Sequence, residues 1–283
     1  MRNYTDFTTL QKISSGAALI LAAEFDRAYK TRMATPTAID VDQWNPTVRD
    51  TLEGLGFFKM MGFDDRYNLP PTNGTKPFHE KLYITPMISG RDAELEPIIE
   101  PLQALLSQAM LDDVSKVALT SALFEAIENV RRHAYPNAKR NAWQIPPLWW
   151  LGGSFDRQDD RLTISLYDQG ATIPWTIINS PLWRTTAESW MKLTGKDMYD
   201  DKLLLTSAMQ VQNSSSVMVN RGLGLPKIRE IVSKTPGGSL LIISRRGIYR
   251  FNDKEETCEV MQLPLYGSYV ELSATFPKPL NVL

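Results

Sequence analysis

The most informative stretch of this 283-residue chain is Phe124-Glu125-Ala126-Ile127-Glu128-Asn129-Val130-Arg131-Arg132-His133-Ala134. Apolar residues recur at three- and four-residue steps from position 112 to position 134, which predicts an amphipathic helix. Asp112 and Asp113 favour a helix start there, because short acidic side chains accept hydrogen bonds from free backbone N–H groups. Four polar residues, three or four positions apart, then project from roughly one side of this helix: Glu125, Asn129, Arg132 and His133.

These side chains suit phosphate chemistry. A carboxylate such as Glu125 can orient and deprotonate an attacking water or hydroxyl. An amide oxygen such as that of Asn129 is a hard ligand for magnesium, which keeps waters and substrate phosphates as its other ligands. Arg132 can contact a phosphate as a fixed cation. Taken by itself, however, the segment is more typical of a solvated helix face with ordinary charges.

A second segment lies downstream, where Asp168-Gln169-Gly170-Ala171-Thr172-Ile173-Pro174 follows an alternating run. The alternation over 161–167 predicts a half-buried strand, which places Asp168 at the end of the strand. Gly170 allows the backbone to turn and a planar ligand to approach closely. The Asp168 carboxylate would suit the exocyclic amine of adenine.

The third segment is Arg221-Gly222-Leu223-Gly224-Leu225, which leads into an amphipathic run over 226–232. Pro226 fits the first turn of a helix, where its missing N–H group is no loss. Glycines just before a helix start leave free backbone amides that can bind phosphate. A simple glycine loop is the alternative for this segment in isolation.

In combination and in this order, the three segments resemble the ATP-binding domain of the gyrase, heat-shock chaperone, histidine kinase and MutL superfamily. The resemblance covers about residues 95 to 277. The wording Glu-Ala-Ile-Glu-Asn-x3-His-Ala-Tyr is most similar to the branch with the anti-sigma-factor serine kinases and the histidine kinase catalytic domains. It implies an α+β fold, a two-layer α/β sandwich of the histidine-kinase-like (Bergerat) type that binds ATP and magnesium.

The resemblance also implies roles for individual residues. Glu125 would be the general base and Asn129 the magnesium ligand, while Arg132 would meet a phosphate and Asp168 would recognise adenine. Further nucleotide contacts would come from the remaining positions of the three segments and from the closing hairpin, over 237–244 and 267–276: His133, Gly170, Thr172, Arg221, Gly222, Leu223, Gly224, Leu225 and Ser268. Ser268 stands where the family often has a threonine at the adenine site.

The chain departs from the family pattern in two places. Thr172 stands where a second glycine is usual, which adds a side chain near the adenine. The stretch between Pro174 and Asn220 is long for a lid and contains Trp175, Trp183 and Trp190, of which we expect at least two to be ordinary core. The serine run over 212–216 predicts a mobile loop that covers the phosphates.

The likeliest domain boundary is the proline-containing stretch 68–78. It separates a small α/β N-terminal unit, residues 1–78, from the ATP-binding domain, residues 79–283. The N-terminal unit is expected to contain a helix over about 9–32, a short strand over 37–41 and a second helix from 45–46 to about 61. It is loosely similar to the sulfate-transporter and anti-sigma-antagonist domain and is a candidate interaction unit.

Composition narrows the compartments and partners to be expected for this protein. The formal net charge is −1, which gives no argument for nucleic acid as a partner. The single cysteine, Cys258, fits a reducing compartment, and no apolar stretch is long enough to span a bilayer or to form a signal peptide. His79 and His133 have no second ligand at zinc spacing. A cytoplasmic protein without nucleic-acid or membrane partners is therefore expected.

Two functions remain open from the sequence. The first is an enzyme, an ATPase or protein kinase that transfers the γ-phosphoryl group of magnesium-ATP to water or to a partner protein in a regulatory system. The second is a nucleotide-gated protein-binding module, similar to an anti-sigma regulator, with slow or no turnover. Both bind ATP and ADP, both imply a regulatory protein partner, and both allow a homodimer.

Overall fold

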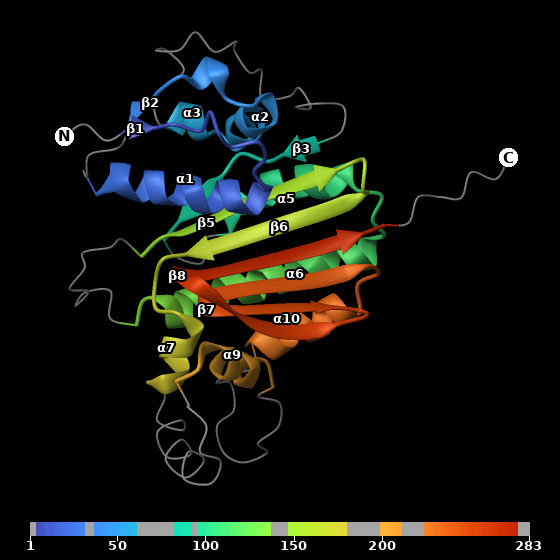
Figure 1. The fold of residues 1–283 in the computed structure, drawn as a ribbon. Coiled ribbons are helices and arrows are strands. Elements are labelled where there is room, and N and C mark those ends of the chain that lie inside the picture. Colours follow the sequence, from blue (N-terminus) through green and yellow to red (C-terminus); the bar gives the residue numbers. More distant parts are fainter. Residues whose placement is uncertain are drawn as a thin grey trace, which may run out of the picture.

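The computed structural model describes residues 4–31, 37–60, 82–91, 95–136, 147–179, 199–210 and 224–276 (Figure 1). The N-terminal elements are β1 (Tyr4–Thr5), α1 (Ser15–Lys30), β2 (Thr37–Ala38), the 3-10 helix η1 (Val41–Gln43), α2 (Pro46–Gly54), α3 (Phe57–Met60), β3 (Leu82–Ile84) and β4 (Ile88–Gly90). Next come α5 (Glu96–Gln108), α6 (Asp113–Asn129), the π-helix η2 (Val130–Ala134), β5 (Trp149–Asp156) and β6 (Arg161–Asp168). The last elements are α7 (Ile173–Ile178), α9 (Asp201–Gln210), α10 (Gly224–Ser233), β7 (Gly238–Asn252) and β8 (Glu256–Thr275).

An antiparallel sheet organises the molecule. Its strand order is β3-β5-β6-β8-β7, and β4 also pairs with β5, which makes it six-stranded. The predicted strand over 161–167 is present as β6, and the predicted closing hairpin is present as β7 and β8. The chain therefore has an α+β fold, with an open antiparallel sheet and packed helices, as the sequence predicted at this level.

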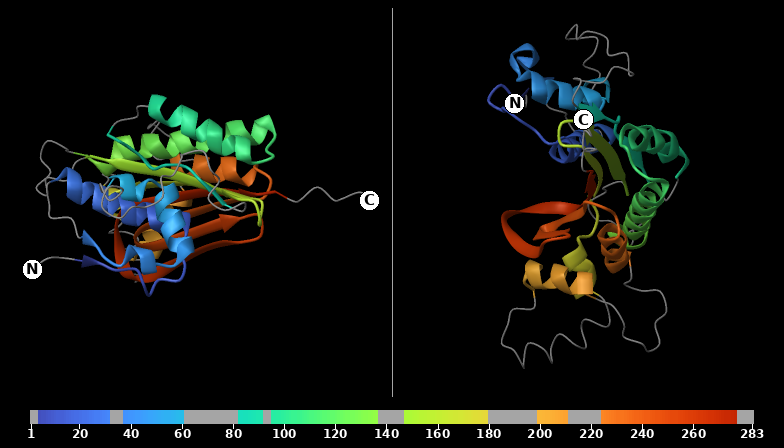
Figure 2. Two further views of the ribbon diagram at one scale, coloured as in Figure 1. Left: turned by 90° about the horizontal axis from the view of Figure 1, so that it is seen from above. Right: turned by 90° about the vertical axis from the view of Figure 1, so that its right-hand side faces the viewer.

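Helices α5, α6 and α10 cover one face of the sheet (Figure 2). Every second strand residue points toward them, because side chains alternate along a strand. Leu123 and Ile127 of α6 and Ile228 of α10 meet Trp149 and Ile242 of the sheet in one continuous core. Neither α5 nor β5 was predicted from the sequence, since β5 is apolar or glycine over most of its length and lacks a clear alternation.

Helix α1 lies on the opposite face of the sheet (Figure 1). Its Leu19 and Ala22 are fully buried in a core that includes three sheet aromatics, Trp150, Tyr167 and Tyr269. Helices α2 and α3 extend this core through Val48, Leu52, Phe57 and Phe58. The first 60 residues thus share a hydrophobic core with the sheet, while the expected linker 68–78 and the boundary after residue 78 lie outside the described residues.

Several predicted elements differ in extent. Helix α1 begins at Ser15, where Ser14 caps the Ala17 N–H group, and the short strand is limited to Thr37–Ala38. The helix predicted up to about 61 is interrupted, because Gly56 has φ +82 and ends α2 before α3 begins. The closing hairpin is longer than predicted, since β7 and β8 continue past a bulge at Arg245–Gly247.

Candidate functional site

The first sequence segment forms the end of α6 and the π-helical turn η2. Asp112 caps the helix through Oδ1, which accepts the Ser115 N–H group at 2.7 Å. The single helix predicted over 112–134 is regular only to Asn129, after which Val130–Ala134 is π-helical. Such turns are frequent at functional sites. This one carries Arg132 and His133, both exposed, and ends at the buried Ala134.

Helix α10 packs across this part of α6. The Lys227 Nζ atom lies 2.6 Å from Glu125 Oε2, and the glutamate side chain is 23% exposed. One turn further along α6, the Asn129 amide lies against Gly224, where the Cβ of any other residue would collide with it. Asn129 Nδ2 is buried and has no hydrogen-bond partner among the described residues. The structure therefore brings Glu125 and Asn129 to the N-terminal turn of α10, where backbone N–H groups lack intrahelical acceptors.

Lys227 was not identified from the sequence as a site residue. Its position in the first helical turn after the glycines was the available signal. A lysine there reaches anions bound at the helix start, and in this structure it reaches the Glu125 carboxylate instead.

The second segment contacts the C-terminal end of η2. The Ala171 N–H group donates to the Ala134 carbonyl oxygen at 2.6 Å. Gly170 lies against that carbonyl so closely that a Cβ would collide with the Ala134 backbone. Tyr135 adds a second connection, because its hydroxyl donates to the Leu148 carbonyl (2.5 Å) and accepts from the Gln169 N–H group (3.1 Å).

Asp168 is the only acidic residue of this turn. Its side chain lies on the sheet face that α5, α6 and α10 cover, because Asp168 stands opposite Trp149, which packs into the core beneath these helices. The residue is 3% exposed, and its Oδ1 accepts the Gly170 N–H group at 2.9 Å. Burial raises the pKa of Asp168 to about 7, and the Gly170 hydrogen bond opposes this shift. The carboxylate form of Asp168 can accept a hydrogen bond from a donor such as an amine.

Ser268 stands directly opposite Asp168 on β8. Its hydroxyl lies 2.9 Å from that of Ser244 on β7, and Ser244 Oγ accepts the Ile173 N–H group at 2.8 Å. Gly267 has φ +90, and a Cβ there would collide with the Asp168 carbonyl oxygen. The sheet end around Asp168 is therefore fixed by β8, β7 and the start of α7.

Thr172 serves as the N-cap of α7. Its Oγ1 accepts the Trp175 N–H group at 3.3 Å, and its carbonyl oxygen accepts from Thr176 Oγ1 at 3.2 Å. The Thr172 side chain is thus engaged locally, in capping α7. Trp175 is 46% exposed, whereas Trp183 and Trp190 lie outside the described residues.

Arg132 has an anionic partner on its own helix. Its Nε donates to Glu128 Oε1 at 2.6 Å, and Arg131 donates to both oxygens of the same carboxylate. The hydrogen bonds from Arg131 and Arg132, with the attraction of their charges, lower the pKa of Glu128 to about 2. Arg132 is half exposed and can exchange this partner for a phosphate only by leaving Glu128.

The structure describes the third segment from Gly224 onward. Arg221, Gly222 and Leu223, together with the serine run 212–216, lie outside the described residues. Gly224 and Leu225 begin α10, and Leu225 is half-buried against the helix-side core. The structure thus unites Glu125, Asn129, Gly224 and Lys227 at one end of η2, and Asp168, Gly170 and Ser268 at the other.

Asn129 is the residue that the resemblance assigns to a magnesium ion arriving with phosphates. Within the described segments, no three His, Cys, Asp or Glu side chains gather to hold a metal. Magnesium, however, needs one or two protein oxygens besides waters and phosphates, and Asn129 Oδ1 can be one of them. Because Gly224 lies against this amide, a ligand there requires a small shift of the α10 start.

None of the described helices combines the length and the apolar character needed to cross a membrane.

No model of a known protein family matches the chain, and none of the curated proteins matches it significantly.

Proposed function

We propose that this protein binds ATP with magnesium in a histidine-kinase-like (Bergerat) site and hydrolyses it or transfers its γ-phosphoryl group to a regulatory protein partner. One observation carries the proposal. The α6–η2 helix contacts the glycine-containing turn after β6 at Ala134 and the start of α10 at Asn129 and Glu125. The turn after β6 and the start of α10 are far apart in sequence, and both contact this one helix.

The roles follow from the chemistry of each position. Asp168 and Ser268 would hold the adenine, since they stand opposite each other on neighbouring strands and offer it a carboxylate and a hydroxyl. The first turn of α10 would receive the phosphates, and Asn129 would hold magnesium, which neutralises phosphate charge. Gly170 and Gly224 keep the backbone close to Ala134 and to Asn129, where the two ends of the nucleotide would lie.

Glu125 would orient and deprotonate the attacking water or hydroxyl. In the structure its carboxylate is paired with Lys227. A phosphate at the start of α10 offers Lys227 a second anion, and the transfer of Lys227 to that phosphate would release Glu125 to act as a base. Lys227 thereby links the arrival of the phosphates to the availability of the base.

Isothermal titration with ATP, ADP and a non-hydrolysable ATP analogue, with and without magnesium, tests binding, and phosphate release on the same sample tests turnover. We expect magnesium-dependent binding. Glu125→Ala is expected to abolish release while it leaves binding largely intact, and Asp168→Ala to weaken binding. Glu230→Gln is a matched control, because it removes a carboxylate from an exposed ion pair with Lys234 near the other end of α10. Phosphate release by Glu125→Ala at the wild-type rate would show that Glu125 is not the base.

A second function uses the same site without turnover. A nucleotide-gated protein-binding module is favoured by the packing of the N-terminal unit against the sheet that carries Asp168. Nucleotide binding without phosphate release, together with a partner or homodimer contact that depends on ATP, would support this function. Neither function needs a nucleic-acid or membrane partner.

A further inference from the structure

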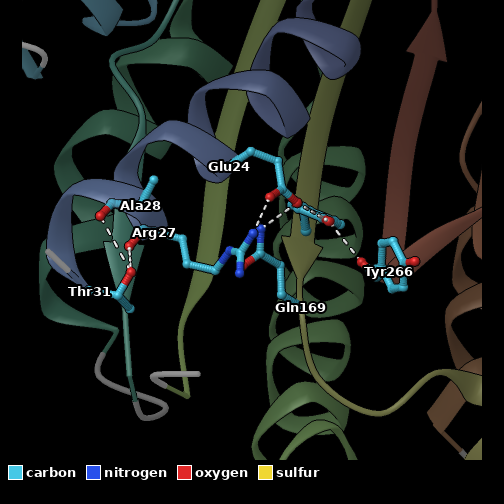
Figure 3. Close-up of polar contacts among 7 residues, drawn as sticks. Glu24, Arg27, Ala28, Thr31, Gln169 and Tyr266 are labelled. Atoms are coloured by element: carbon cyan, nitrogen blue, oxygen red, sulfur yellow. Dashed lines mark hydrogen bonds and ion pairs between the residues drawn. The ribbon is translucent and has the colours of Figure 1, made fainter. Parts of the chain in front are cut away.

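Helix α1 contacts the residue that follows Asp168. Gln169 Nε2 donates to Glu24 Oε1 at 2.7 Å, across 145 positions of sequence (Figure 3). The other Glu24 oxygen accepts from Arg27 Nη2, also on α1, at 2.7 Å. Gln169 is 7% exposed. A charged acceptor on the N-terminal helix therefore fixes a buried side chain in the turn of the candidate site.

The residue before Asp168 is connected to the same place. The Tyr167 hydroxyl donates to the Tyr266 carbonyl oxygen at 2.7 Å and lies 3.2 Å from Glu24 Oε1. Because side chains alternate along a strand, Tyr167 faces α1, while Asp168 faces α5, α6 and α10 on the other side of the sheet. Both neighbours of Asp168 are thus held from the α1 side, and the Gln169 backbone N–H is held by Tyr135 from the other.

The glutamine at position 169 carries a free-energy cost as well as a bond. Its Oε1 is buried without a hydrogen-bond partner among the described residues, as is Arg27 Nε. A buried acceptor without a partner costs free energy, and an apolar side chain of similar length would avoid that cost. What the glutamine amide supplies is its donor, which reaches Glu24.

We propose that Glu24 and Gln169 couple helix α1 to the adenine end of the nucleotide site, with Gln169 as a positioning residue for Asp168. This inference rests on the proposed function. A displacement of α1 withdraws the acceptor of Gln169, loosens the turn and weakens adenine binding, while the phosphate end at α10 is unaffected. By linkage, nucleotide binding strengthens the contact between α1 and the sheet to the same extent.

The first test compares two ligands by titration, ATP and inorganic tripolyphosphate, which lacks the adenine. Gln169→Met and Glu24→Ala should each weaken ATP binding on the order of tenfold and leave tripolyphosphate binding unchanged. The double variant should be no weaker than either single one, because both remove the same bond. Equal effects on the two ligands, or additive losses in the double variant, would overturn the coupling.

Two control variants separate this bond from general weakening of α1. Ser15→Ala removes a different bond between α1 and the sheet, from Ser15 Oγ to Ser154 Oγ at 2.9 Å, at the opposite end of the helix. Arg27→Met removes the Arg27 partner of Glu24 but leaves the Gln169 bond possible. Both should bind ATP as the wild type does. A loss in Ser15→Ala as large as that in Glu24→Ala would assign the effect to α1 packing and overturn the proposal.

A second measurement needs no nucleotide. The backbone N–H groups of Gln169, Gly170 and Ala171 bond to Tyr135, Asp168 and Ala134, so their hydrogen exchange reports the order of the turn. Glu24→Ala should speed their exchange, and Ser15→Ala should not. If exchange responds but the wild type does not bind ATP, the proposed function fails while the link from α1 to the turn stands. If ATP binds but neither exchange nor affinity responds to Glu24→Ala, the coupling fails alone.

Discussion

Asp168 is a buried acidic residue at the end of β6. It is buried on the helix-covered side of the sheet end, one of its oxygens accepts from Gly170, and Ser268 stands opposite. A carboxyl in such a place is held neutral more easily than in water, which is why its pKa is raised to about 7. Near neutral pH the residue is therefore close to the midpoint of its titration.

This gives a stability prediction with a definite sign. The folded-state pKa lies above the value of 3.8 for an ordinary Asp, so the folded chain binds more protons than the unfolded one between about pH 4 and pH 7. The contribution of Asp168 to stability is fully present below pH 4 and is lost as the pH rises through 7, by on the order of 4 kcal/mol.

Asp168→Asn carries no charge and should lack this loss. Urea unfolding at pH 5 and pH 8 should show the variant gaining stability relative to the wild type at the higher pH. Asp159→Asn, in the exposed turn between β5 and β6, is the control. A constant difference between Asp168→Asn and wild type across this range would contradict the raised pKa.

Lys227 supports a second prediction at the residue scale. Lys227→Met removes the cation beside Glu125 and, in the proposed site, one phosphate ligand. We expect ATP affinity to fall about tenfold, in line with the loss of one charge-assisted contact, while adenosine affinity stays unchanged. Titration with both ligands measures this, and parallel losses for ATP and adenosine would show that Lys227 acts on the fold instead.

At the scale of elements, the contact between η2 and the turn after β6 decides whether the segments form a site. It rests on the backbone hydrogen bond from Ala171 to Ala134, on the bond from the Gln169 N–H group to the Tyr135 hydroxyl, and on the absence of a side chain at Gly170. Helix α10 contributes the other contact, through Gly224 and Lys227. Each depends on where one helix ends or begins.

Gly170→Ala tests the first contact. The added Cβ would collide with the Ala134 backbone, which cannot yield as a flexible side chain does. We expect a stability loss of about 1–3 kcal/mol, typical of overpacking, and weaker nucleotide binding. Thermal unfolding and titration measure both effects. Thr172→Ala should by contrast cost about 1 kcal/mol as a lost helix cap with binding retained, and Gly170→Ala behaving as mildly as this variant would show that the turn tolerates a side chain.

For the whole molecule, the sheet is covered on both sides. Helices α5, α6 and α10 lie over one face and α1 over the other, where Asp26 accepts from Trp150 Nε1 and from Lys30 Nζ, each at 2.7 Å. The buried aromatics Trp150, Tyr167 and Tyr269 would be exposed without α1. The N-terminal residues and the sheet therefore depend on each other.

We expect the whole chain to unfold in a single transition. Tryptophan fluorescence and far-UV circular dichroism should give coincident curves in urea, because the two cores lie on opposite faces of one sheet and share its strands. Trp150→Phe should shift both curves together, since it leaves the buried Asp26 carboxylate without one of its donors. Two separated transitions would show that residues 1–60 fold independently of the sheet.

The sequence by itself determined the features that depend on neighbours along the chain. Periodicity, caps and glycine spacing predicted α6, β6, the start of α10 and the closing hairpin, and they placed Asp168 at the end of its strand. They also singled out Glu125 and Asn129 before any fold was known. Local geometry fixes these elements because backbone hydrogen bonds and side-chain alternation act over only a few residues.

Only the tertiary structure decided which partners these residues have. The pair Glu125 and Lys227 is 102 positions apart, and Glu24 and Gln169 are 145 apart, so no local pattern indicates them. The π-helical end of α6, the cap at Thr172 and the second core under α1 likewise arise from packing between distant elements. Contacts of this kind form only when the sheet brings the segments together, and for that reason they could not be predicted from the sequence alone.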